Sequence, residues 1–369
     1  MAKNGNLNAA GRAKKDEFYT QLSDIEKEMR YYRKHFDGKT VFCNCDDPFE
    51  SNFFKYFVLN FNKLNLKKLI ATCYTGSPIA GKQLSLFDVI GEEEDKQNKA
   101  YKAIVTTVHD ADGNGGIDML DVAELFKKGE NELTELKEDG DFRSSECLKL
   151  MEEADIVVTN PPFSLFRQYV NTLIKYKKKF IIIGNVNAIT YKDFFPLIKD
   201  NKVWIGASIH SGDRKFYVPD DYPLNAAGCG VDANGRRFIK VKGVRWYTNL
   251  DLKTRHEDLI LVKRYSPASY PRYENYNAIE VDSTTSIPCD YPGEMGVPIT
   301  FLDKYNPDQF EIIGYSRDVA IPIKQIAKQG DNYQQGGNAF YLREGPHELR
   351  RLYGRIVIRN LHPEAPMEE

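Results

Sequence analysis

Residues 154–163, ADIVVTNPPF, end in side chains that could hold a planar amine. Asn160 offers one hydrogen-bond acceptor and two donors, and the carbonyl of Pro161 adds an acceptor whose direction is set by the fixed proline φ. Two such acceptors suit the two N–H groups of one exocyclic amine. The ring of Phe163 is a flat face for a planar base, and such stacking contributes about 1–3 kcal/mol per base. Asn160, Pro161, Pro162 and Phe163 are therefore the candidate catalytic residues.

The run before Asn160 is apolar and β-branched, which predicts a buried strand that ends at the amide. In open α/β sheets, ligands bind beyond the carboxyl ends of the strands. Two prolines make this strand end stiff, and catalysis by positioning suffers when a site is misplaced by about an ångström. Two prolines after a strand are also common in ordinary loops. The order of the surrounding elements favours a rigid clamp for an amine.

Strands and helices alternate through the first two thirds of the chain, which predicts an α/β fold with a parallel sheet. After residue 211 the helical patterns give way to strands, and the last hundred or so residues are rich in Pro, Tyr, Asn and Gly. The predicted helices are 16–36, 52–64, 164–176 and 191–200, and the predicted strands are 39–45, 66–76, 102–108, 154–160, 178–185, 202–207, 213–219, 236–250 and 258–265.

These changes in composition and periodicity along the chain predict three parts and one insertion. The first fifteen residues are basic and contain glycine, which indicates a mobile arm, and acidic runs mark the insertion. The predicted organisation is a mobile basic arm at 1–15, a catalytic domain at 16–264 with an acidic insert at about 77–138, and a loop-rich recognition region at 265–369.

The formal net charge is −2, so a nucleic-acid partner would need a local basic surface. Residues 236–264 hold nine Lys/Arg against three acids, beside Trp246 and Tyr247. A surface that tracks DNA phosphates is favoured over a merely solvated strand face. The candidate DNA-binding residues are Arg236, Arg237, Lys240, Lys242 and Arg245.

The sequence gives little support to a membrane, secreted, disulfide-bonded or metal-binding protein. No stretch is long and apolar enough for a membrane span, and the N-terminus lacks the apolar centre of a signal peptide, so we expect a soluble, cytoplasmic protein without a membrane partner. The six cysteines show no C-x-x-C pair and indicate reduced thiols. Residues 110–121, DADGNGGIDMLD, match part of a calcium loop, but they end in Asp and follow a predicted strand, which favours a turn and no metal.

The strand-end motif resembles the fourth motif of S-adenosylmethionine-dependent amino-methyltransferases, in the form used for adenine N6. A longer string of segments between residues 16 and 314 resembles the EcoRI-type adenine-specific DNA methyltransferases. The segments are DEFYTQ, CNCDDPFESNFFKYF, GDFRSSE, DIVVTNPPFSLFR, NVNAITYKD, WYTNLD and MGVPITFLDKYNPDQFEIIG. The resemblance implies a Rossmann-like methyltransferase fold, with a mostly parallel seven-stranded sheet and helices on both faces.

The resemblance also implies roles for individual residues. Phe216 lies at the position where the family has a second aromatic ring that stacks on an extruded base, in addition to the ring of Phe163. Asp141 stands where a carboxylate accepts from the amine of the cofactor adenine. The implied cofactor residues are Tyr19, Thr20, the turn of Asn44, Cys45, Asp46, Asp47 and Pro48, and the pair Asp141 and Phe142.

The sequence thus predicts transfer of a methyl group from S-adenosylmethionine to N6 of a flipped adenine in double-stranded DNA, with a cognate restriction endonuclease as a candidate partner. Two alternatives stay open. RNA or protein-glutamine methyltransferases use a similar Asn-Pro-Pro-aromatic site. A non-catalytic DNA-binding relative is the other alternative, because the first loop lacks glycine and the second strand lacks the acid that usually binds ribose.

Overall fold

The computed structural model describes residues 20–44, 51–74, 100–218, 222, 224 and 228–365. The predicted arm, Tyr19, the turn from Cys45 to Pro48 and residues 77–99 of the predicted insert lie outside these described residues. The chain divides into two compact units. The first covers 1–187 and 205–250, and the second covers 188–204 and 251–369, whereas the sequence places a boundary after 264.

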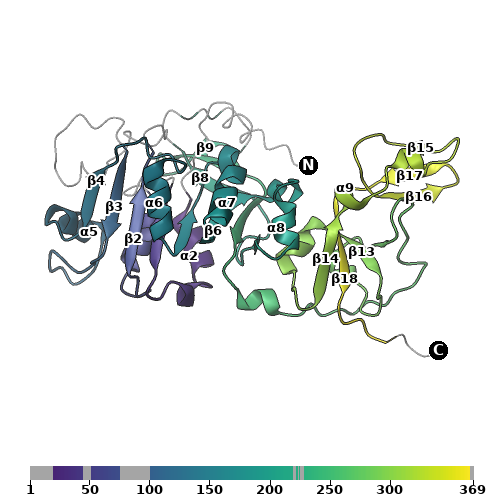
Figure 1. Ribbon diagram of the computed structural model, residues 1–369, viewed down its shortest axis with the longest axis horizontal. Helices are drawn as coiled ribbons and strands as arrows, with labels where there is room; N and C mark the ends of the chain where they lie inside the picture. The colour runs from purple at the N-terminus through teal and green to yellow at the C-terminus, as the bar shows by residue number, and fades with distance from the viewer. Residues whose placement is uncertain are drawn as a thin grey trace. The chain divides into compact units, whose positions relative to one another are not determined.

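An eight-stranded sheet forms the core of the first unit, in the order β4-β3-β2-β1-β5-β6-β11-β7 (Figure 1). Strands β2, β1, β5 and β6 pair in parallel, and β11 runs antiparallel to β6. The eight strands are β1 Thr40–Cys43, β2 Lys68–Thr72, β3 Tyr101–Val105, β4 Glu132–Glu135, β5 Ile156–Thr159, β6 Lys179–Asn185, β7 Trp204–Ile205 and β11 Val244–Thr248.

The sheet has one strand more than the seven predicted, because β4, an edge strand within the acidic insert, is not among the predicted strands. Strand β3, which lies in this insert, runs antiparallel to both β2 and β4. Strand β4 therefore points in the same direction as the four central strands. Every residue of β1 and β5 is buried, as expected for parallel strands that are covered on both faces.

Short capped helices connect these strands. The side chain of Ser51 accepts hydrogen bonds from the first turn of α3, and Asp118 begins α5 with a capping box. Helices α6 and α7 lie in front of the sheet in Figure 1. Within the described part of this unit, the helices are α2 Leu22–Met29, α3 Asn52–Leu59, α5 Met119–Lys127, α6 Ser145–Glu153 and α7 Phe166–Lys175, with short 3-10 turns at η1 Arg33–His35 and η2 Phe163–Leu165.

A small antiparallel sheet completes the first unit, in the order β8-β10-β9. Its strands are β8 Arg214–Tyr217, β9 Gly230–Val231 and β10 Arg237–Val241. Phe216 pairs with Ile239, and Lys215 pairs with Lys240. Because side chains alternate along a strand, Phe216 and Lys215 point to opposite faces of this sheet.

The second unit contains two further sheets in place of long helices. A four-stranded sheet has the order β12-β13-β18-β14, and a three-stranded sheet has the order β15-β17-β16. The strands are β12 Ile279–Glu280, β13 Glu294–Pro298, β14 Phe310–Tyr315, β15 Asn332–Tyr333, β16 Tyr341–Gly345, β17 Glu348–Arg351 and β18 Arg355–Asn360. The helical segments are α8 Phe195–Lys199, α9 Ser316–Val319, η4 Lys253–His256, η5 Thr284–Ser286, η6 Ile299–Lys304 and η7 Ile323–Gln325, and η3 Val186–Thr190 spans the division between the units.

The strand predicted at 258–265 does not form. This segment makes a single isolated bridge, between Lys263 and Pro288, and leaves the side chains of Ile260 and Val262 exposed. Alternating apolar residues predicted a strand, but a strand also needs a partner along its length. Among the described residues, no helix has the length and hydropathy of a membrane span.

Candidate active site

The candidate catalytic motif lies at the carboxyl end of a central strand, as predicted. Strand β5 ends at Thr159, and the next three residues, Asn160, Pro161 and Pro162, are all buried. Phe163 opens the short turn η2 and is half-buried. The stiff segment therefore places the Asn160 amide just beyond the strand, and the aromatic ring of Phe163 follows the two prolines.

Asn44 holds the neighbouring strand ends together. Its side-chain nitrogen donates to the Thr72 hydroxyl at the end of β2, at 3.0 Å. Its side-chain oxygen accepts from the hydroxyl of Tyr169 on α7, at 3.1 Å. The Thr159 hydroxyl donates to the main-chain oxygen of Asn44. The fully buried Asn44 side chain thus fixes β1, β2, β5 and α7 relative to one another.

A glycine brings Asp141 close to the end of β2. Gly140 has a φ of +79°, and a Cβ at this position would lie 2.0 Å from the main-chain oxygen of Cys73. The main-chain N–H and the Nε–H of Arg143 both donate to Asp141 at 2.8 Å. Burial raises the pKa of Asp141, but the bonds from Arg143 outweigh it, and the pKa lies below its ordinary value. Asp141 is therefore an ionised acceptor at neutral pH.

Tyr169 is a site residue that sequence reasoning missed. Besides its bond to Asn44, its ring packs edge-to-face against Phe142, with centroids 4.9 Å apart. It therefore connects the ends of the central strands with the segment that carries Asp141. The available signal is a tyrosine on the buried face of the helix that follows the motif.

Thr20 presents a buried hydroxyl beside the first helix pair. Its main-chain oxygen accepts from Asn52 at the start of α3, at 2.7 Å. The next residue, Gln21, donates through its side chain to the main-chain oxygen of Lys215 on β8, at 2.8 Å. Among the described residues, no group makes a hydrogen bond to the Thr20 hydroxyl. Because a buried polar atom normally has a partner, this hydroxyl suits a polar ligand.

The two predicted stacking residues come together. The rings of Phe163 and Phe216 are 6.4 Å apart and perpendicular, an edge-to-face pair. Phe216 is buried on the inner face of β8, whereas Phe163 is half-buried. A base can be sandwiched between two parallel rings but not between two perpendicular ones. Stacking in this arrangement would therefore use the face of one ring.

The five basic residues predicted to bind DNA differ in exposure. Lys240 and Lys242 are exposed, and Arg236 is exposed beside Asp232. Arg237 is half-buried and donates to the main-chain oxygen of Tyr222. The side chain of Arg245 is buried and donates to main-chain oxygens within the protein. Arg236, Lys240 and Lys242 are therefore the members of this set whose side chains are exposed to solvent.

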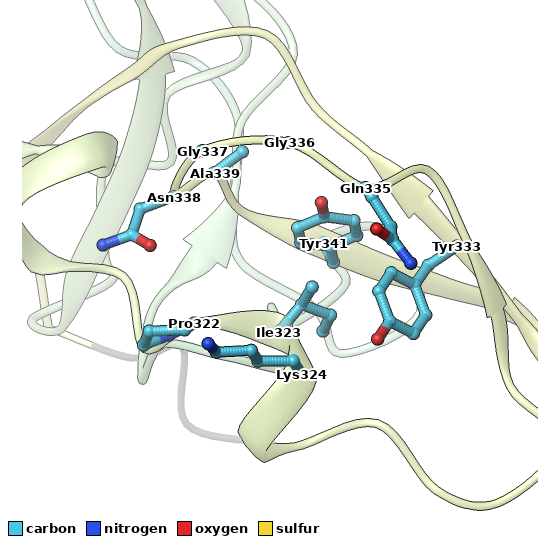
Figure 2. A pocket seen from close by; sticks show the side chains of 10 residues that line it. All are labelled: Pro322, Ile323, Lys324, Tyr333, Gln335, Gly336, Gly337, Asn338, Ala339 and Tyr341. Atoms are coloured by element: carbon cyan, nitrogen blue, oxygen red, sulfur yellow. The ribbon is translucent and has the colours of Figure 1, made fainter.

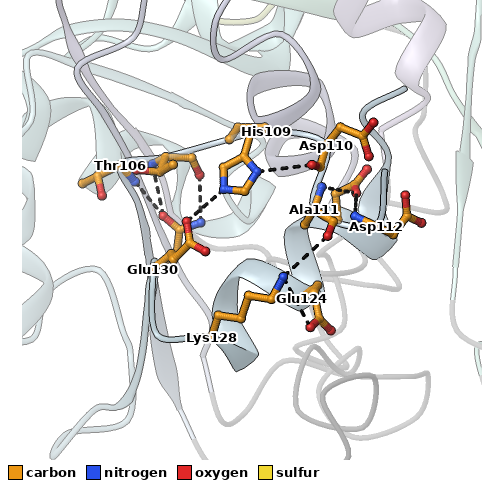
Figure 3. Close-up of polar contacts among 12 residues, drawn as sticks. Thr106, His109, Asp110, Ala111, Asp112, Glu124, Lys128 and Glu130 are labelled. Carbon is orange, nitrogen blue, oxygen red and sulfur yellow. Dashed lines mark hydrogen bonds and ion pairs between the residues drawn. The ribbon is translucent and has the colours of Figure 1, made fainter. Parts of the chain in front are cut away.

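The loop that resembles a calcium site is held by hydrogen bonds of its own (Figure 3). Carboxylate oxygens of Asp110, Asp112 and Asp121 lie within 4.8 Å of one another. Main-chain N–H groups donate to Asp110 and Asp121, and Asp121 belongs to the capping box of α5. A strand rather than a helix precedes the loop. This arrangement is that of a turn leading into a helix cap.

Comparison with known proteins defines the class to which this arrangement belongs. Residues 6–361 match the family model described as adenine-specific methyltransferase EcoRI, so the chain belongs to this family of adenine-specific methyltransferases. The resemblance predicted from the sequence motifs is confirmed.

Individual relatives agree with the family. The chain is 47% identical over 325 residues to the type II methyltransferase M.EcoRI of Escherichia coli, covering 86% of this chain and 92% of the relative. It is 36% identical over 349 residues to M.MgeORF184P of Mycoplasma genitalium, covering 91% and 96%. It is 34% identical over 314 residues to M.MpnI of Mycoplasma pneumoniae, covering 83% and 84%. Both mycoplasma proteins are also named type II methyltransferases. No solved structure matches the chain.

Proposed function

We propose that the protein is a site-specific DNA methyltransferase that transfers a methyl group from S-adenosylmethionine to N6 of an adenine extruded from the duplex. The observation that carries this proposal is the buried Asn160 at the end of β5, with Phe163 following it and packing against Phe216. Extruding a base costs a few kcal/mol, which stacking and backbone contacts offset.

Asn160 and Pro161 have the acceptors to orient the target amine. The Asn160 side-chain oxygen and the Pro161 carbonyl accept its two N–H groups, so the nitrogen lone pair points toward the methyl donor. Phe163 stacks on the base and keeps it in this plane. Positioning of this kind, with water excluded, is what the protein contributes to a transfer between bound groups.

The residues around the strand ends fit S-adenosylmethionine. The cofactor supplies an activated methyl group when bound. Thr20 would contribute its buried hydroxyl to holding the cofactor, and Asp141 would contribute an ionised acceptor for an exocyclic amine. Asn44 and Phe142, which both contact Tyr169, belong to the proposed cofactor-binding set, and Tyr19 with the turn from Cys45 to Pro48 completes it.

Replacing Asp141 with alanine should weaken S-adenosylmethionine binding by about 1–3 kcal/mol, the range for leaving a buried donor unpaired. Isothermal titration with the cofactor measures this change. Glu152→Ala removes an exposed carboxylate from α6 and serves as the matched control. Equal affinities for the two variants would show that Asp141 does not bind the cofactor.

Lys240 and Lys242 should contact DNA phosphates without selecting a sequence. Their joint replacement by glutamine is expected to weaken binding to cognate and random duplexes in parallel. The slope of log affinity against log salt should fall by about 0.9 for each lost phosphate contact. The double variant Lys149→Gln and Lys175→Gln removes the same charge from α6 and α7 and is the control. Altered site preference at undiminished affinity would mean that this segment contacts bases.

Methyl transfer from labelled S-adenosylmethionine to duplex DNA, RNA and protein tests the substrate class. We expect labelled N6-methyladenine in duplex DNA alone. Label in RNA or in protein glutamine, with none in DNA, would overturn the proposal. Because the relatives are named type II methyltransferases, a cognate restriction endonuclease that cuts the unmethylated site is the proposed partner in the cell.

A further inference from the structure

The second unit contains a hollow of about 380 Å³ beside the three-stranded sheet. One wall comes from the turn η7, and the other comes from the segment that connects β15 with β16. Figure 2 shows Tyr341 at the back, Gln335 and Asn338 on either side of it, and Lys324 along the opposite wall. Aromatic, amide and ammonium groups thus face one space.

A small core makes this hollow rigid. Tyr341 packs with Ile323, Ala339 and Leu349 in a buried cluster, and the half-buried Tyr333 packs against the same cluster. The rings of Tyr333 and Tyr341 meet edge-to-face at 6.3 Å. The apolar floor is therefore formed before any ligand arrives.

A buried amide joins the two walls. The side-chain nitrogen of Asn275 donates to the main-chain oxygens of Ile321, at 2.7 Å, and Ala339, at 2.8 Å. Its side-chain oxygen accepts from the main-chain N–H of Tyr341, at 3.1 Å. One fully satisfied side chain thus fixes the turn η7 against strand β16, which indicates a built site rather than a gap in packing.

The rim carries polar groups that the protein itself does not use. Gln335 and Asn338 are exposed, and their side chains make no hydrogen bond within the described parts of the chain. Lys324 and Arg351 have no carboxylate within ion-pair distance among the same residues, and Arg351 donates to the main-chain oxygen of Gly337 at the rim. The side chains of Gln335, Asn338 and Lys324 are therefore exposed to solvent, whereas Arg351 beside them is half-buried.

The charge of this rim is positive. Among the residues that the structure describes, no aspartate or glutamate lines the hollow. Two nearby acids are already paired, Asp331 with Arg343 and Glu344 with Arg350. An anionic ligand is therefore favoured over a cationic one.

We propose that this hollow reads one A·T base pair of the target DNA, with Gln335 and Asn338 on the base edge and Lys324 and Arg351 on the adjoining phosphates. Asn and Gln amides pair with the N6 and N7 positions of adenine in the major groove, and an antiparallel β-ribbon such as β16–β17 fits that groove. Tyr333 supplies apolar contact for the thymine methyl group. The inference rests on the proposed methylation of DNA and assigns its sequence selectivity to this second site.

The double variant Gln335→Ala and Asn338→Ala tests whether these side chains contact the bases. The control is the double variant Gln325→Ala and Gln329→Ala, which removes two exposed amides of the same unit that do not line the hollow. Methylation of a duplex panel, in which each base pair of the site is changed in turn, is measured for each protein. The double variant should lose discrimination at one A·T position by roughly ten- to a hundredfold and keep it at the other positions. The control should discriminate like the wild type.

Lys324→Gln, compared with Lys328→Gln, tests the phosphate contact. It should weaken binding to all duplexes in parallel and reduce the slope of log affinity against log salt by about 0.9.

If a variant loses methylation activity, its binding to each duplex of the same panel measures the discrimination instead, and its melting temperature shows whether it is folded. Unchanged discrimination in the Gln335/Asn338 variant, with DNA methylation by the wild type intact, overturns this inference alone. A wild type that does not methylate DNA overturns the proposed function itself.

Discussion

Replacing Asn160 with alanine is expected to reduce methyl transfer by about a hundredfold or more, while S-adenosylmethionine affinity stays within a few-fold of the wild type. The loss of one positioned polar group that acts in the transition state typically has an effect of this size. Asn160 is proposed to act on the target amine, whereas Thr20, Asp141 and their neighbours are proposed to hold the cofactor. The two functions should therefore separate in one variant.

Single-turnover transfer to duplex DNA and titration with the cofactor measure these two effects. Asn249→Ala is the matched control, because Asn249 bonds to the main chain of Lys178 and Phe180 at the opposite end of β6. That variant should lose stability and retain transfer. Normal turnover by Asn160→Ala would exclude the amide from the chemistry. A large loss of cofactor affinity would place Asn160 in the cofactor pocket.

Gly140→Ala is expected to have the second-largest effect, on both stability and cofactor binding. A non-glycine residue in the left-handed region costs about 1–2 kcal/mol. At Gly140 the added Cβ would also lie 2.0 Å from the Cys73 main-chain oxygen, so the backbone has to move. Because Asp141 is the next residue, the movement should displace its carboxylate and weaken S-adenosylmethionine binding as well as lower the melting temperature.

Gly129→Ala separates the two causes. Gly129 has a similar φ, +72°, but no atom lies within 4 Å of the position that its Cβ would take. This control should show the strain of the left-handed backbone alone and should leave cofactor affinity unchanged. Equal losses of melting temperature and affinity in both variants would mean that close contact with Cys73 does not shape the site.

Local patterns predicted the strand end that carries Asn160, because an apolar run stopped by an amide and two prolines leaves few alternatives. The contacts that complete the site are not local. Tyr169 donates a hydrogen bond to Asn44, which is distant in the sequence. Phe163, which follows β5 of the large sheet, packs against Phe216 on β8 of the three-stranded sheet. Nothing in the spacing of these residues encodes that proximity, so only the family resemblance pointed to Phe216.

Two differences between sequence and structure share a physical cause. The segment 258–265 alternates like a strand but stays largely unpaired, whereas the mostly polar segment Glu132–Glu135 was not predicted and forms β4 by pairing with β3. Whether a segment becomes part of a sheet depends on a partner strand elsewhere in the chain. The periodicity of a segment indicates that it could form a strand, but it does not show whether another strand is available to pair with it.

Sequencing with modified-base detection tests the central proposal most directly. Genomic DNA is compared from a host that lacks its own adenine methyltransferases and expresses either the wild type or Asn160→Ala. We expect N6-methyladenine at every copy of one short sequence with the wild type, and none with the variant. Unmodified DNA from cells that contain folded, cofactor-binding wild type would contradict it, as would the same methylation in both strains.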